Sequence, residues 1–139
     1  MFRLLLLAAP LAALILAGSD SRAVAADENP VIGLIKSKVK DTKKPFALLV
    51  TFKVKAGEEK KFEAAFAPAL IATRKEPGCV AYFLNRDPDE ANTYIMYEQF
   101  KSLAAVEDHL KQKHTETLLA TVIPMCEGDL KVKVLQVPE

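Results

Sequence analysis

The 139-residue sequence has little of three features that would assign it to a special class. Its two cysteines are too few for the disulfide framework of a small secreted scaffold. Eight prolines and five glycines are too few for a fibrous or low-complexity chain. Lysine and arginine number 19 against 18 acidic residues, so no charge excess indicates a nucleic-acid partner. One ordinary globular domain with room for an appendage is the expectation that remains.

An apolar segment opens the chain and predicts a secretory signal peptide over residues 1–26. A short start with one positive charge precedes an uncharged, leucine-rich run over residues 4–17. Small residues follow, with Ala23-Val24-Ala25 at the spacing of a cleavage site. The run is shorter than the ~20 residues that span a bilayer, although an uncleaved anchor is the alternative. We expect a periplasmic or secreted protein without a stable membrane anchor after cleavage.

Residues 27–45 predict a basic N-terminal extension. Five lysines alternate there with valine, isoleucine and leucine. An added strand or a short helix would both suit this pattern. The lysines could attract an anionic membrane surface, but the acidic residues among them favour a solvated arm.

The pattern of the remaining chain predicts an α+β fold. The expected order is strand, helix, strand, strand, helix and strand. The strands are residues 46–54, 79–87, 93–100 and 130–137, the first helix is 58–76, and the second helical region has a seam over 102–110 and a further helical piece over 115–123. This order is the split βαβ, ferredoxin-like arrangement. Apolar side chains occur on both faces of the strands, so the face without helices needs a partner. A homodimer that pairs two sheets satisfies that need.

Four segments, taken in order, resemble the antibiotic biosynthesis monooxygenase family in its quinol monooxygenase branch. They are FKVKAG (52–57), ATRKEPGC (72–79), RDPDEANTYIMYEQF (86–100) and HLKQKH (109–114). The likeness extends over about residues 46–137. It implies a dimeric ferredoxin-like α/β barrel, with residues 46–139 as the family domain.

The resemblance also implies oxygenation without metal, flavin or haem. Family enzymes act on electron-rich phenols or quinols, which themselves supply electrons to dioxygen. We therefore expect a small quinol or polyphenolic aromatic compound and dioxygen as partners. Such chemistry needs an apolar cleft with one or two proton-handling groups. A non-catalytic small-molecule-binding or stress-response module on the same fold is the alternative.

His109 and Glu98 are the candidate catalytic residues. His109 follows Val106 by three positions on its predicted helix and so borders the buried seam, and its ordinary pKa of about 6.5 suits a general base. Glu98 lies between apolar neighbours in its strand, where a carboxylate needs a partner or a raised pKa. A satisfied structural histidine and a structural pair of Glu98 with Arg86 are the alternatives.

The substrate-binding candidates lie on the same strand faces or on the following helix. They are Tyr82, Arg86, Tyr94, Phe100 and His114. The three aromatic residues would form either pocket walls or core, and Arg86 would form a polar anchor with Glu98. His114 would face inward or interact with the carboxyl end of its helix.

Spacing argues against a metal site and against an intrachain disulfide. His109 and His114 are five positions apart, which places them about 140° apart on a continuous helix, whereas zinc-binding helices use a four-residue step. Cys79 and Cys126 belong to strands expected at opposite edges of the sheet. We expect two buried thiols, or a bond between subunits in an oxidising compartment.

Overall fold

The computed structural model describes residues 29–138, so the predicted signal peptide lies outside the described residues. The elements, in chain order, are α1 (Pro30–Lys38), β1 (Phe46–Lys53), α2 (Glu59–Thr73), β2 (Cys79–Arg86), β3 (Thr93–Phe100), α3 (Leu103–Leu110), α4 (Lys113–Val122), the 3₁₀ turn η1 (Ile123–Met125) and β4 (Lys131–Gln136). The strands form one antiparallel sheet in the order β2-β3-β1-β4. This confirms the predicted ferredoxin-like α+β class. Within the described range, no helix has the length and apolarity to span a membrane.

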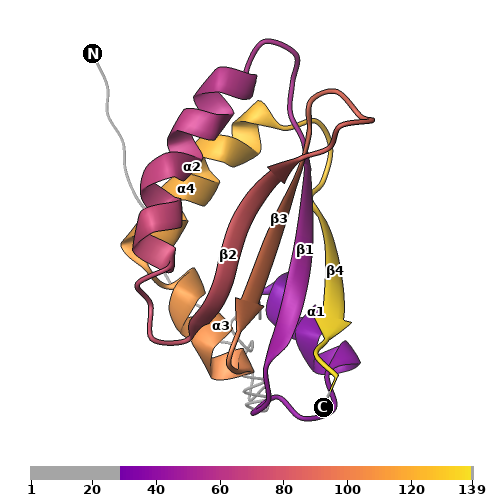
Figure 1. Ribbon diagram of the computed structural model, residues 1–139, viewed down its shortest axis with the longest axis vertical. Coiled ribbons are helices and arrows are strands. Elements are labelled where there is room, and N and C mark those ends of the chain that lie inside the picture. The colour runs from indigo at the N-terminus through magenta and orange to yellow at the C-terminus, as the bar shows by residue number, and fades with distance from the viewer. Residues whose placement is uncertain (1–28, 139) are drawn as a thin grey trace, which may run out of the picture.

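The helices gather on one side of the sheet. In Figure 1, α2 and α4 lie side by side, α3 continues below them, and α1 lies near the lower end of β4. Side chains of β1 and β3 alternate between this helical layer and the opposite face. On the helical side, Phe52, Phe62, Phe66 and Tyr94 form an aromatic core with ring centroids 4.9–5.6 Å apart.

The helical region after β3 is divided into two helices. The hydroxyl of Ser102 accepts a hydrogen bond from the Ala105 amide at 3.3 Å, so the predicted cap begins α3. Lys111 and Gln112 then interrupt the helix, because Gln112 adopts an extended backbone before α4 starts. This break changes the directions of the side chains that follow it.

The N-terminal extension is a short helix that packs into the protein. The side chain of Asn29 caps α1, and proline occupies its first turn. Ile32, Ile35 and Val39 are buried in a core cluster with residues of β1 and α3. The solvated-arm interpretation was therefore wrong for this stretch, because it gave the lysines more weight than the apolar residues at helical spacing between them.

Both cysteines are free, as expected for strands at opposite sheet edges. Cys79 begins β2 at one edge, and Cys126 precedes β4 at the other. Burial raises the pKa of both thiols, so both are held in the neutral form.

Candidate functional site

A cavity of about 420 Å³ lies between the sheet and the helical layer. Most of its wall is aliphatic or aromatic, with contributions from α1, all four strands, α3 and α4. Four polar side chains interrupt this apolar wall deep in the protein: Tyr82, Glu98, His109 and Thr115. A concave apolar site with a few polar groups is the usual form of a small-molecule pocket.

Glu76 holds the imidazole of His109 in one orientation. His109 lies in the last turn of α3, and Glu76 lies in the turn that follows α2. The Nδ1 atom of His109 is 2.9 and 3.1 Å from the two carboxylate oxygens of Glu76. These contacts assign the proton of a neutral imidazole to Nδ1, which donates to the carboxylate. The Nε2 atom, which has no partner among residues 29–138, is then the nitrogen left for a ligand in the cavity.

Burial keeps this imidazole neutral. Only 4% of His109 is exposed, and its loss of hydration lowers the pKa, while the hydrogen bond to Glu76 opposes that shift. The ring packs at 5.0 Å from Phe100 and 5.5 Å from Tyr82, measured between centroids. A neutral imidazole beside a carboxylate can accept a proton at Nε2, because the resulting cation would be stabilised by Glu76.

Glu98 presents a protonated carboxyl group to the same cavity. The residue is 9% exposed, and its carboxyl group forms no hydrogen bond to another side chain of the described range. Burial, with a smaller contribution from the Glu76 charge, raises the pKa of Glu98 to about 8. At neutral pH the group is therefore a hydrogen-bond donor that can hold a ligand oxygen. Burial and the Glu98 charge likewise raise the pKa of Tyr82, which keeps its phenol protonated.

The other predicted site residues lie outside the cavity wall. Tyr94 is buried in the aromatic core and donates its hydroxyl to Glu63 at 2.6 Å, and burial raises its pKa to about 12. The Phe100 ring packs against the His109 ring. His114 is partly exposed, and its Nε2 is 2.6 Å from Glu76 Oε1. It is a second donor to the carboxylate that orients His109.

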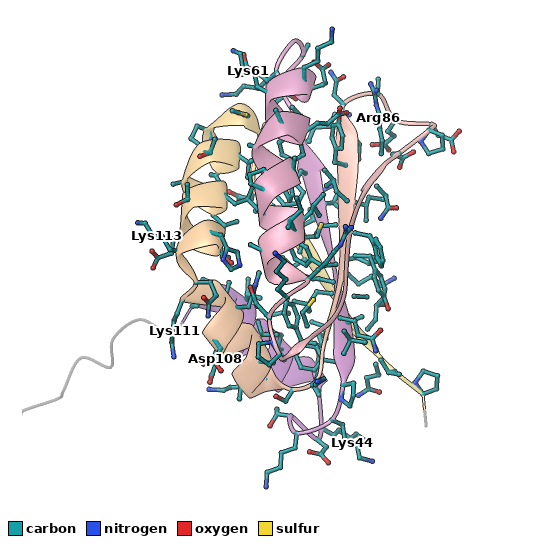
Figure 2. All side chains as sticks on the ribbon, turned by 60° about the vertical axis from the view of Figure 1, so that its left-hand side comes forward. Lys44, Lys61, Arg86, Asp108, Lys111 and Lys113 are labelled. Carbon is teal, nitrogen blue, oxygen red and sulfur yellow. The ribbon has the colours of Figure 1, made fainter. Side chains whose placement is uncertain are left out.

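Arg86 and Glu98 do not form the predicted polar anchor. In the β2–β3 register, Glu98 is opposite Tyr82, whereas Arg86 is opposite Tyr94. The guanidinium lies 5.9 Å from the Tyr94 ring centroid. Figure 2 shows Arg86 near the β2–β3 turn, at the other end of the molecule from Asp108 of α3. The two residues share a sheet face, but Glu98 lies four positions along β3 from Tyr94, the register partner of Arg86.

The helix break overturns the argument that separated the two histidines. Because α3 and α4 are distinct helices, His109 and His114 converge on Glu76 instead of diverging. Lys111 within this break and Lys113 at the start of α4 lie on the outer surface (Figure 2). The three possible ligand atoms lie within 4.8 Å of one another, and two imidazoles with a carboxylate are donors that would suit Zn²⁺ or a similar cation. In the structure these donors are joined to one another by hydrogen bonds.

Two polar residues of the site and the wall supplied by α1 were not predicted from the sequence. Glu76 was assigned only to the end of a helix, and Thr115, whose Oγ1 is 3.3 Å from His109 Nδ1, only to the start of another. No periodic pattern connects these residues. The ferredoxin-like order alone brings the turn after α2 beside the junction of α3 and α4.

The family model for antibiotic biosynthesis monooxygenases matches residues 45–120. This segment is more than half of the chain. The chain belongs to the antibiotic biosynthesis monooxygenase family. The match confirms the resemblance first seen in the ordered segments of the sequence. It includes Glu98, His109 and Glu76, but it excludes α1.

Solved structures and a curated relative are similar over most of the described range. A protein from Caulobacter crescentus, named for antibiotic biosynthesis monooxygenases, is 26% identical, with a TM-score of 0.65 over 71% of this chain and 94% of its own. Rv0793 from Mycobacterium tuberculosis is 23% identical, with a TM-score of 0.65 over 69% of this chain and 97% of its own. An uncharacterized Synechocystis protein is 23% identical over 101 residues, which are 73% of this chain and 69% of that relative.

Proposed function

We propose that this protein is a monooxygenase that oxidises a small quinol or polyphenolic aromatic compound with dioxygen in the cavity beside His109. One observation carries the proposal: a buried neutral imidazole, held through Nδ1 by Glu76, lines a largely apolar cavity. Membership of the family supports the reaction class. The cavity size suits a substrate of two or three fused rings.

Each polar group of the site has a separate role in the proposed reaction. Nε2 of His109 accepts the phenolic proton of the bound quinol, and the Glu76 carboxylate stabilises the imidazolium that forms. The protonated Glu98 carboxyl donates a hydrogen bond to a substrate oxygen. The apolar remainder of the wall excludes water, which favours direct reaction of the electron-rich anion with dioxygen.

The proposed reaction balances without an external reductant. A quinol with a free ring position and one dioxygen molecule give a hydroxyquinone and one water molecule. One oxygen atom forms a bond to the ring carbon, whose hydrogen leaves as a proton. The other oxygen atom leaves as water after the O–O bond breaks. All four electrons that reduce dioxygen come from the substrate, two from the quinol oxidation and two from the ring hydroxylation.

Oxygen uptake tests the proposal directly. The full chain would be mixed with reduced naphthoquinols in the presence of a chelator, beside His109→Gln and the matched variant Asp108→Asn. Asp108 is the exposed neighbour of His109 on the outer side of α3 (Figure 2). We expect Asp108→Asn to keep the wild-type rate and His109→Gln to lose at least about a hundredfold, the usual contribution of a general base. Equal rates for all proteins and for buffer would contradict the oxygenase proposal and favour a binding module.

We further propose that the protein acts outside the cytoplasm as a homodimer. The amino-terminal sequence pattern supports export. Apolar side chains on the sheet face away from the helices support pairing with a second copy; Phe83 is 52% exposed there.

A further inference from the structure

We propose that α1, which lies outside the family-matched segment, selects ligands by size, with Leu34 and Val31 as the specificity-determining residues. The inference rests on the proposed function to the extent that the cavity holds the substrate. It names what that substrate must carry: an apolar ring or alkyl group directed away from the polar cluster. It also assigns a role to a segment that the family domain does not include.

Two adjacent faces of α1 have different surroundings. Ile32 and Ile35 are buried in the core cluster with Phe46 and Phe100. Val31 and Leu34 line the cavity and are only partly buried, and Val31 also packs against the edge of that cluster. Residues three positions apart lie about 60° apart around a helix, so these two side chains form one continuous patch.

The patch is held in place at both ends of the helix. The Asn29 side chain accepts a hydrogen bond from the Val31 amide at 3.0 Å at the start of α1. The Gln136 amide donates to the Lys38 carbonyl at 3.3 Å at its end. With the buried isoleucines between them, these bonds make α1 a fixed wall, so a side chain on it sets a fixed limit to ligand length.

The position of α1 opposes it to Tyr82 and Glu98 across the sheet. The helix contacts α3 and also β4, which is the sheet edge opposite β2. The polar groups come from β2, β3, α3 and α4, including Tyr82 and Glu98. A bound quinol that directs an oxygen to Glu98 on β3 therefore directs its apolar part along the cavity toward Leu34. Aliphatic side chains there recognise shape and length, because they offer no hydrogen bond.

Oxidised 2-alkyl-1,4-naphthoquinones provide a probe series that binds without turnover. Their dissociation constants would be measured by calorimetry for chains from methyl to hexyl, with the full chain and the variants Leu34→Ala and Leu34→Phe. Each methylene that is buried strengthens binding about fourfold, until the chain reaches the wall. We expect Leu34→Ala to move the best chain length up by one to three carbons, and Leu34→Phe to move it down.

Ile71→Ala is the matched control, because Ile71 is an exposed aliphatic residue of α2 outside the cavity wall. It should keep the wild-type chain-length profile. The inference is overturned if both Leu34 variants also keep that profile, or if none of the proteins binds the series. A shifted profile without oxygen uptake would instead contradict the monooxygenase proposal alone. Oxygen uptake with an unshifted profile would contradict the role of α1 alone.

Discussion

At the residue scale, the site depends on one carboxylate that binds two histidines and one carboxyl group that burial keeps protonated. Glu76 receives hydrogen bonds from His109 and His114. Glu98 has no such donors among the described residues, and burial raises its pKa to about 8. A buried carboxyl group with a raised pKa, next to a cluster of other titratable groups, is typical of active sites.

Glu76→Gln should separate two effects of Glu76: orientation of the His109 imidazole and stabilisation of its positive charge. The amide can keep the geometry by offering its oxygen to His109 Nδ1, but it cannot stabilise an imidazolium by charge. We expect kcat for quinol oxidation to fall by about tenfold to a hundredfold, with KM changed much less. His114→Gln, which leaves the carboxylate in place, should lose less than Glu76→Gln. The opposite ranking would contradict the stabilisation of the imidazolium by the Glu76 carboxylate.

Glu98 should make both activity and stability fall as pH rises. Its folded-state pKa of about 8 exceeds the ordinary value of 4.5, so the folded protein holds a proton that the unfolded chain releases between these values. The free energy of unfolding should therefore decrease from about pH 4.5 to pH 8 and then level off. Glu98→Gln should remove that slope and stabilise the protein by about 1–3 kcal/mol at pH 8. Chemical denaturation across this pH range measures both proteins.

The Glu98→Gln substitution also tests whether ionisation of Glu98 weakens ligand binding at high pH. The glutamine side chain of that variant would still donate a hydrogen bond through its amide, so binding of the naphthoquinone probe should lose its decline above about pH 8. Calorimetry of both proteins across this pH range measures the difference. An unchanged decline in the variant would show that another group controls it.

At the element scale, the sequence predicted strands well and helix junctions poorly. The alternation in residues 46–54 and 93–100 locates β1 and β3, because one face of each is buried. The break at Lys111–Gln112 carries neither glycine nor proline, so no turn residue announces it. The convergence of His109 and His114 was therefore predictable only from the packed structure. The burial of α1 likewise depends on surfaces that distant segments supply.

The turn before β2 packs closely against α3. This contact is a second feature that depends on the packed structure. A Cβ added at Gly78 would lie inside van der Waals contact with Ala105 Cβ, so glycine is required there. Gly78→Ala should lower stability by about 1–3 kcal/mol, because α3 must move to make room. Ala105→Gly in the same chain should restore part of the loss. Thermal unfolding of the single and double variants tests this, and an additive result would contradict direct contact.

At the scale of the whole molecule, the open sheet face predicts self-association. Phe83 on β2 and Ile95 on β3 both present apolar surface on that side. We expect light scattering to give the mass of a dimer for the wild type. Phe83→Lys with Ile95→Lys should shift the protein to a monomer, whereas the exposed substitution Ile71→Lys on α2 should not. A wild-type monomer at micromolar concentration would contradict the prediction.

The amino-terminal sequence predicts a further change to the whole chain. Cleavage at the small residues should remove about 26 residues and leave a mature protein that begins at Ala26 or Asp27. Mass spectrometry of the exported protein measures its first residue. Recovery of the uncleaved chain in a membrane fraction would favour the anchor alternative.

The central claim is that dioxygen reacts with a quinol in the cavity beside His109. Its most direct test is turnover of a reduced naphthoquinol under ¹⁸O₂, followed by mass spectrometry of the product from wild type, Asp108→Asn and His109→Gln. The account predicts one labelled oxygen atom in the hydroxyquinone and the second in water, with the labelled product nearly absent for His109→Gln. Unlabelled quinone in equal amounts from all three proteins would show only spontaneous oxidation and would contradict the claim.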